Sequence, residues 1–257
     1  MNVDTLIVED ILLLMLGDAD RAPVTSLDGA LGGAVLAELA LRGHARVEDR
    51  RATSDPLEVI VAASGDGTLL DPLLGVAHEA VTAAPRRLRT ALPGLGASLR
   101  TPVVERLIER GLLRRERRGF GGLISTTRLP ATERHETRLR EQLRLVLELG
   151  ADPAPRLTAL IALVSAVGTL PSLHPHPRWT GQVATRARRL GRGGTGDLGV
   201  EAAAVVHGVA AALSTATVAS PPTSGSGLVA LSVLVGTPAA TRRACSLADR
   251  QESRCAR

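Results

Sequence analysis

The 257-residue chain contains no lysine, so all 31 of its basic side chains are arginine. The lack of an ε-amino group excludes the Lys-dependent phosphate-binding loop, Schiff-base catalysis and Ser-x-x-Lys acylation. Aromatic residues are almost absent too, because there is no Tyr and Phe120 and Trp179 are the single Phe and the single Trp. This argues against modules that stack bases on aromatic platforms, such as RNA-recognition sheets and single-strand-binding OB folds.

Cysteine and long apolar runs are scarce as well. Cys245 and Cys255 are the two cysteines, so no disulfide framework is indicated and a reducing cytoplasm is the expected compartment. The longest strongly apolar runs, 11–16 and 228–235, are far shorter than the roughly 20 residues that span a bilayer. The first 20 residues carry five acids and no base, the reverse of a signal peptide, and we expect no export signal.

The positive charge is concentrated in one segment. Residues 85–118 contain ten Arg and three Glu, a local charge of +7, whereas the whole chain has a net charge of +5. The rest of the chain is therefore close to neutral. A segment of this kind predicts contact with a phosphate-bearing partner.

The apolar periodicity predicts mostly helices. A helix is expected over 4–16, with its acids at 9 and 10 away from the apolar face, and a second one from a cap at Ser26 or Asp28 to about residue 42. Small residues of the second helix predict a close helix contact or a backbone approach to a ligand. Short strands are expected at 45–47 and 57–62, and a Gly-rich break at 94–96. The other expected elements are helices over 69–83, 85–92, 99–111, 132–149, 153–170, 178–190 and 200–217, and strands over 112–118 and 123–127 joined by a turn at 119–122.

No motif in the sequence indicates a metal site or catalysis. His174 and His176 are the closest histidine pair, but each is followed by Pro and neither has a Cys or carboxylate nearby, so a loop is the better interpretation. Residues 191–196 fit the spacing GxGxxG, yet they follow an Arg-rich helix rather than a strand. We therefore expect no enzyme, no cofactor and no metal.

The basic segment is open to three interpretations. A helix over 99–111 followed by a hairpin is typical of a winged helix, whose arginines would meet nucleic-acid phosphates. The same arginines would also suit anionic lipid headgroups, with Phe120, Leu123 and Ile124 inserting shallowly beside them. The third interpretation is that these apolar residues cover a core or a subunit interface.

Five motifs in a fixed order resemble the Golgi phosphoprotein 3 family. They run from Val8 to Leu16, from Leu31 to Gly43, from Val104 to Leu113, from Thr126 to Pro130, and through the stretches 151–153 and 160–163. The resemblance as a whole covers about residues 4–217. The all-Arg, Ala-rich composition is similar to that of actinobacterial members, whereas eukaryotic members are Golgi-associated adaptors on the cytoplasmic side of the membrane.

The resemblance implies a mainly α, single globular multi-helix domain over 1–219, with short β elements and a projecting β-hairpin. A Ser/Pro/Gly linker and a poorly ordered tail are expected over 220–257. The resemblance also implies a peripheral membrane protein that binds phosphatidylinositol 4-phosphate. Of four headgroup positions carried over from eukaryotic members, one matches Arg100, two fall on Gly32 and Ala97, and the fourth, a Trp, has no counterpart.

We therefore expect a non-enzymatic, cytoplasmic protein that associates peripherally with membranes. The expected partner is an anionic phospholipid or phosphoinositide, and the hairpin, including Phe120, Leu123 and Ile124, would insert or form a homo-oligomer. The expected headgroup residues are Arg100, Arg106, Arg114, Arg115, Arg117 and Arg118. Nucleic acid is the less favoured partner, and a protein-protein adaptor is a further alternative.

Overall fold

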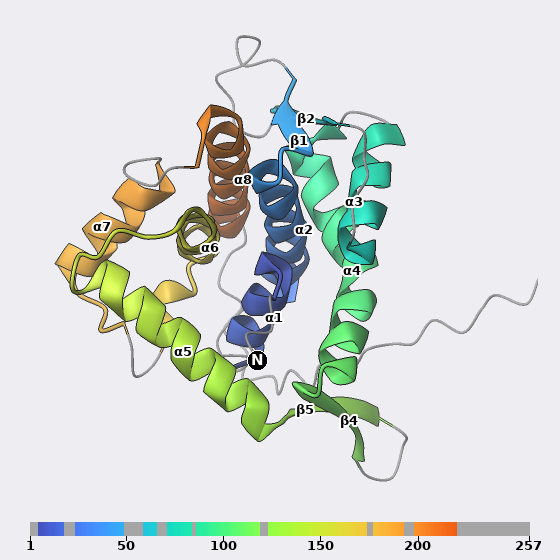
Figure 1. Cartoon of the computed structure of the whole chain (residues 1–257), viewed down its shortest axis with the longest axis vertical. Helices are drawn as coiled ribbons and strands as arrows, with labels where there is room; N and C mark the ends of the chain where they lie inside the picture. Colours follow the sequence, from blue (N-terminus) through green and yellow to red (C-terminus); the bar gives the residue numbers. More distant parts are fainter. Residues whose placement is uncertain are drawn as a thin grey trace, which may run out of the picture.

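The computed structural model describes residues 5–17, 24–48, 59–65, 71–83, 86–118, 123–173, 177–192 and 198–219. Most of these residues are helical, which confirms the predicted mainly α fold (Figure 1). The elements in chain order are α1 (Ile7–Gly17), α2 (Val24–Leu41), β1 (Ala45–Val47), β2 (Ile60–Ala63), α3 (Pro72–Ala83), β3 (Arg86–Arg87), α4 (Leu88–Glu109), β4 (Leu113–Arg118), β5 (Leu123–Arg128), α5 (Pro130–Leu147), α6 (Pro155–Ala166), the 3₁₀ turn η2 (Leu170–Ser172), α7 (Gly181–Gly191) and α8 (Val200–Ala219).

Helices α1 and α2 lie at the centre of the molecule (Figure 1). Helix α2 packs against α1, α4, α6 and α8, and its Leu31, Leu36 and Leu39 are fully buried. A helix with neighbours on several sides must be apolar around most of its circumference, as α2 is. The two central helices thus form the scaffold on which the other elements are placed.

Glycines allow α2 and its neighbours to approach closely. A Cβ atom at Gly32 would overlap the carbonyl oxygen of Leu92, and one at Gly33 would lie 2.6 Å from Val209 Cγ1. The same holds on the other side of the α2–α4 contact, where a Cβ at Gly96 would lie 2.9 Å from the Cα of Asp28. Of the two roles predicted for the small-residue face, close helix packing is therefore confirmed.

Helix α4 corrects the predicted break at residues 94–96. It runs without interruption from Leu88 to Glu109, although Pro93 and Pro102 lie inside it. The glycines there do not end the helix, because Gly96 is required for the contact with α2 and the buried Leu95 and Leu99 hold this segment in place. The predicted cap at Ser26 or Asp28 is also wrong, since α2 begins at Val24 and both residues lie inside it.

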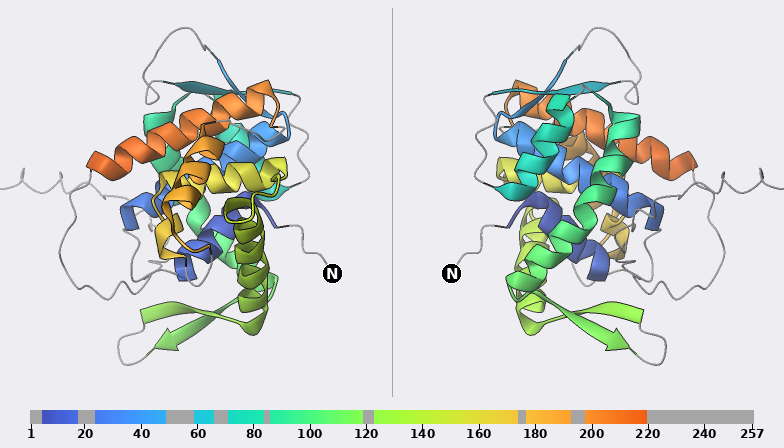
Figure 2. Two further views of the ribbon diagram at one scale, coloured as in Figure 1. Left: turned by 90° about the vertical axis from the view of Figure 1, so that its left-hand side faces the viewer. Right: turned by 90° about the vertical axis from the view of Figure 1, so that its right-hand side faces the viewer.

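The strands form two separate antiparallel sheets. Strands β1, β2 and β3 pair in that order, with Ala45 opposite Ala63 and Ile60 opposite Arg87. Strands β4 and β5 form the predicted hairpin, with Leu113 opposite Arg128. The hairpin extends away from the helices, in line with the expected projection (Figure 2).

Helix α5 leads from the hairpin to the far side of the molecule, where α6, α7 and α8 complete the domain (Figure 1). Helix α6 packs against α7 and α8, and α8 reaches β1. None of the described helices is long and apolar enough to cross a membrane. Phe120, the His174–His176 pair, residues 193–196 and the tail 220–257 lie outside the described residues, so the predictions for them stay predictions.

Candidate functional site

The hairpin carries exposed positive charge at its base. The side chains of Arg114 and Arg115 are exposed on β4, directly after the end of α4. Arg115 Nη2 lies 3.1 Å from Glu105 Oε1, and because both side chains are largely in solvent this ion pair contributes at most about 1 kcal/mol. A phosphate group can therefore compete for Arg115 at little cost.

The structure describes only the backbone of the rest of the predicted hairpin site. Arg117 pairs with Ile124, and Arg118 pairs with Leu123, across the β4–β5 ladder. These four residues therefore lie beside one another near the end of the hairpin. Their expected roles in headgroup contact and membrane insertion, together with that of Phe120, stay predictions.

Arg100 is joined to an acid on the central helix. Its Nη2 atom lies 2.5 Å from Asp28 Oδ1, and each of the two side chains is 26% exposed. The pair sits beside the point where Gly96 touches the backbone of Asp28. The positive charge of Arg100 is thus already compensated within the protein.

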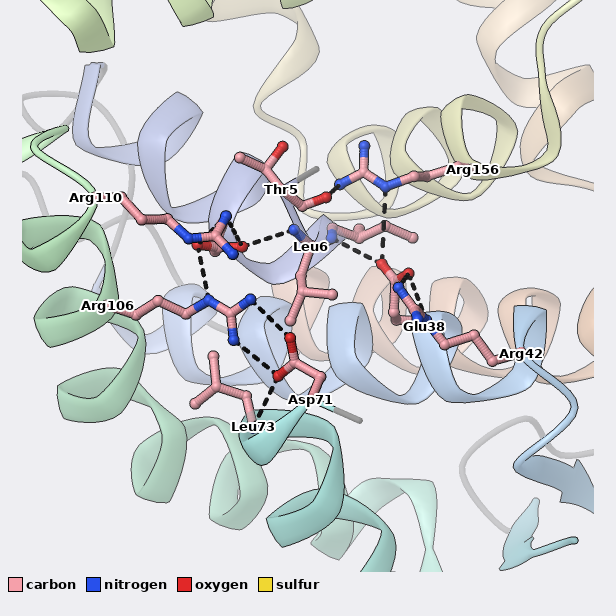
Figure 3. Close-up of polar contacts among 11 residues, drawn as sticks. Thr5, Leu6, Glu38, Arg42, Asp71, Leu73, Arg106, Arg110 and Arg156 are labelled. Carbon is pink, nitrogen blue, oxygen red and sulfur yellow. Dashed lines mark hydrogen bonds and ion pairs between the residues drawn. The ribbon is translucent and has the colours of Figure 1, made fainter. Parts of the chain in front are cut away.

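Arg106 is held by two acids and is mostly buried (Figure 3). Its Nη2 atom lies 2.7 Å from Asp71 Oδ2, and its Nε atom lies 3.3 Å from Glu9 Oε1. Arg110, the residue directly after the end of α4, contacts the same Glu9 oxygen at 3.2 Å. Arg106 in the last turn of α4 and Arg110 at its C-terminal end therefore bind acids of α1 and of the residue before α3, rather than facing solvent together.

The titration of this cluster follows from burial and charge. Burial raises the pKa of the Glu9 carboxyl, and the Leu6 N–H, Arg110 and Arg106 only partly offset this effect. Burial tends to raise the pKa of Asp71 as well. The hydrogen bonds that Asp71 accepts and its ion pair with Arg106 outweigh this effect and leave the pKa of Asp71 below its usual value. Burial likewise tends to lower the pKa of Arg106, but Asp71 and Glu9 raise it overall. Arg106 therefore stays charged.

A second buried group fixes the start of α1. Glu38 of α2 accepts a hydrogen bond from the Ile7 N–H at 2.9 Å and also contacts Arg42 and Arg156 (Figure 3). Arg156 of α6 donates to the backbone carbonyl of Thr5. These contacts satisfy the Ile7 N–H, one of the free backbone donors at the helix start, and link α1, α2 and α6.

Two acids were expected on the polar side of the first helix, but both are buried. Asp10 accepts hydrogen bonds from Thr5 Oγ1 at 3.0 Å and His135 Nε2 at 2.8 Å, and its other oxygen lies 2.8 Å from Arg156 Nη2. Glu9 is equally inaccessible. Sequence reasoning missed this network because its members come from α1, α4, α5 and α6; the one available signal was a pair of acids in a run that is otherwise apolar.

The outward side of the second half of α4 is acidic. Leu99, Val103 and Leu107 face the core, while Glu105 and Glu109 are exposed. This arrangement places negative charge where the recognition helix of a winged helix would need positive charge. Among the described residues there is also no group of three or more His, Cys, Asp or Glu that could hold a metal ion.

The predicted headgroup residues therefore differ in their exposure and in their ion-pair partners. Arg114 and Arg115 are exposed on the hairpin, where Arg115 forms an ion pair with the exposed Glu105, whereas Arg100 and Arg106 form partly buried ion pairs within the helical body. The count of charges along the sequence could not separate the two groups, because the separation depends on which acids lie opposite each Arg.

Comparison with protein-family models gives a match over most of the chain. The family model for Golgi phosphoprotein 3 (GPP34) matches residues 7–212, from the start of α1 into α8. No curated protein matches the chain in a sequence comparison. Because the family model covers far more than half of the sequence, this chain belongs to the Golgi phosphoprotein 3 family.

Proposed function

We propose that this protein is a non-enzymatic peripheral membrane protein that binds anionic phospholipid through its basic hairpin. The observation that carries the proposal is the pair of exposed arginines, Arg114 and Arg115, on a hairpin that projects from the helical body. Basic residues near an anionic membrane contribute about 1 kcal/mol each. Membership of the Golgi phosphoprotein 3 family supports the same conclusion.

We further propose that recognition depends on charge density rather than on phosphatidylinositol 4-phosphate itself. An arginine at the Gly32 position has no room, since a side chain there would meet the backbone of Leu92. Arg100 is paired with Asp28, and residue 97 is alanine. A site built from Arg114 and Arg115 would bind any accessible phosphate, since the guanidinium groups match phosphate geometry in general.

The alternatives have less support. A winged-helix mode would bring α4 against a duplex, but Glu105 and Glu109 occupy its outward side. A protein adaptor that self-associates through the hairpin remains the second candidate, because the apolar residues Leu123 and Ile124 lie in β5.

Vesicle co-sedimentation tests the proposal. Vesicles of pure phosphatidylcholine, vesicles with 30 mol% phosphatidylglycerol, and vesicles with phosphatidylinositol 4-phosphate at matched surface charge are compared. We expect binding to both anionic vesicles, none to phosphatidylcholine, and weaker binding at high salt because the Debye length shortens. The double variant Arg114→Glu, Arg115→Glu is expected to lower partitioning at least about 30-fold, from about 1 kcal/mol for each Arg.

A charge-matched control separates the hairpin from net charge. Arg46 on β1 and Arg138 on α5 are exposed, so Arg46→Glu, Arg138→Glu makes the same change elsewhere on the surface. The control is expected to keep most of the binding. Absence of binding to any anionic vesicle, or an equal loss in both double variants, would contradict the proposal.

A further inference from the structure

A second basic surface lies at the end of α5 that is remote from the hairpin (Figure 1). We define the α7 surface as Leu149, Trp179, Arg186, Arg188, Arg189 and Arg192. Residues 177–192 contain five Arg and no acid. The apolar side chains of α7, Val183, Ala187 and Leu190, are buried, and α7 packs against α6. The charged side of the helix is thereby turned outward.

The arginines of the α7 surface are not compensated in the way that those of α4 are. Arg186 Nη2 donates to the backbone carbonyl of Ala151 at 3.1 Å, and Arg188 Nε donates to that of Ala184 at 3.2 Å. These contacts orient the side chains without neutralising them. In the part of the chain that the structure describes, neither Arg188, Arg189 nor Arg192 forms an ion pair with a carboxylate, in contrast to Arg100 and Arg106.

Exposed apolar side chains border this charge. Trp179 is 43% exposed and Leu149 is 64% exposed. The end of α5 and the segment before α7 are joined by a hydrogen bond of 2.5 Å from the Arg178 N–H to Glu148 Oε1. Leu149 and Trp179 are the residues that come directly after these two bonded residues in the chain. A Trp beside basic residues is typical of a surface that rests at the water–lipid boundary.

The α7 surface is hollowed rather than flat. A groove of about 540 Å³ lies between the end of α5 and the first turns of α7, and Arg186, Arg189 and Thr185 line it. An adjoining hollow of about 500 Å³ shares Arg189 and Thr185 and adds Arg188 and Arg192. Glu148 is the one acid on the wall of these hollows, within the residues described. A phosphate in the groove would therefore meet an excess of guanidinium groups.

We propose that the α7 surface is a second membrane contact, in which the groove takes the phosphate of an anionic phospholipid headgroup and Trp179 and Leu149 enter the interfacial layer. The inference rests on the proposed function and adds a site to it. Helix α7 itself does not insert, because its apolar stripe is already covered by α6. The contact is instead shallow and electrostatic, with the two exposed apolar side chains as anchors.

Trp179 provides a direct readout, since it is the single Trp of the chain. The full chain is mixed with vesicles containing 30 mol% phosphatidylglycerol, and Trp emission is recorded together with co-sedimentation. We expect a shift of the emission to shorter wavelength and quenching by brominated acyl chains. Vesicles of pure phosphatidylcholine are expected to produce neither.

The variant Arg188→Glu, Arg189→Glu is expected to abolish the emission shift and to lower partitioning about 30-fold. The hairpin variant Arg114→Glu, Arg115→Glu lowers partitioning but leaves the emission of the bound fraction shifted, because its substitutions lie at the opposite end of α5. Far-ultraviolet circular dichroism verifies that both variants are folded. The control Arg46→Glu, Arg138→Glu is expected to retain the shift.

The outcomes separate the two proposals. If the protein sediments with anionic vesicles but Trp179 emission and bromine quenching do not change, the α7 contact is wrong and the hairpin proposal stands. If the protein does not sediment at all, the proposed function fails and the α7 contact fails with it. An emission shift with poly-glutamate but not with vesicles would also overturn the membrane assignment, since it identifies an acidic polypeptide as the partner.

Discussion

The contact between α2 and α4 predicts opposite effects for two alanine substitutions in one helix. Gly96 and Gly94 are two residues apart in α4, but a Cβ at Gly96 would overlap the backbone of Asp28, whereas a Cβ at Gly94 has no atom within 4 Å. Gly94 is exposed and Gly96 is buried. Both substitutions gain about 1 kcal/mol of helix propensity. The difference between the unfolding free energies of the two variants therefore measures the cost of packing a methyl group against α2.

The magnitude follows from what the new methyl group meets. Overpacking a well-packed interior costs about 1–3 kcal/mol, and the upper value applies here because a backbone carbonyl has no rotamer by which to move away. After the gain in propensity, Gly96→Ala is expected to destabilise the protein by about 2 kcal/mol, and Gly94→Ala to stabilise it by up to about 1 kcal/mol. For a domain of this size the melting temperatures should shift by about 6 °C downward and about 3 °C upward.

Thermal and urea unfolding, followed by circular dichroism at 222 nm, measure both variants. Urea unfolding gives the free energy directly where heating is irreversible. If Gly96→Ala is as stable as Gly94→Ala, the helices are not in backbone contact at this point. The explanation for the uninterrupted α4 would then be wrong as well.

Three further predictions concern the ionised groups and a helix cap. Asp71→Asn keeps the hydrogen bond from the Leu73 N–H but loses the ion pair with Arg106, so it should lower the free energy of unfolding by about 2 kcal/mol at pH 7. Because the pKa of Asp71 in the folded protein lies below 3.8, the stability difference between the variant and the unmodified protein should disappear as the pH falls below the folded pKa. Urea titrations at several pH values measure this difference, and a difference that does not change with pH would refute the prediction. Burial lowers the pKa of His207 from 6.5, so the unfolded chain binds more protons and stability should decline as the pH falls through 6.5; His207→Gln should remove this decline, and an unchanged pH profile would contradict the reasoning. Thr180→Ala removes the side-chain acceptor for the Val183 N–H and should cost about 1 kcal/mol with faster amide exchange at the start of α7, whereas Thr180→Ser should not.

Periodicity was a good guide where packing is local. The hairpin over β4 and β5, the helix stop at Gly111 and the helices from α5 to α8 follow from apolar spacing and turn residues near each other in sequence. The small-residue face of α2 likewise predicted a close contact, and the structure identifies α4 and α8 as its neighbours.

The candidate site was less predictable. The local charge of residues 85–118 suggested one basic surface, but Arg100 and Arg106 are neutralised by Asp28, Asp71 and Glu9, which lie 35 or more residues away in sequence. The five arginines of residues 177–192 are a smaller cluster in the sequence, yet Arg188, Arg189 and Arg192 remain without an acidic partner in the described structure. A charge count cannot show which side chains are compensated.

The sequence by itself determined four features of this protein. They are a core made of aliphatic side chains, arginine as the only strong base, a mostly helical chain, and the order of motifs that marks its family. Only the tertiary structure decided that α4 continues through Gly94 and Gly96, and that some arginines face acids while others face solvent. The physical reason is the same in both cases. Backbone contact and charge compensation depend on groups brought together from distant parts of the chain, and the energy of those contacts exceeds the local preferences that a sequence pattern reports.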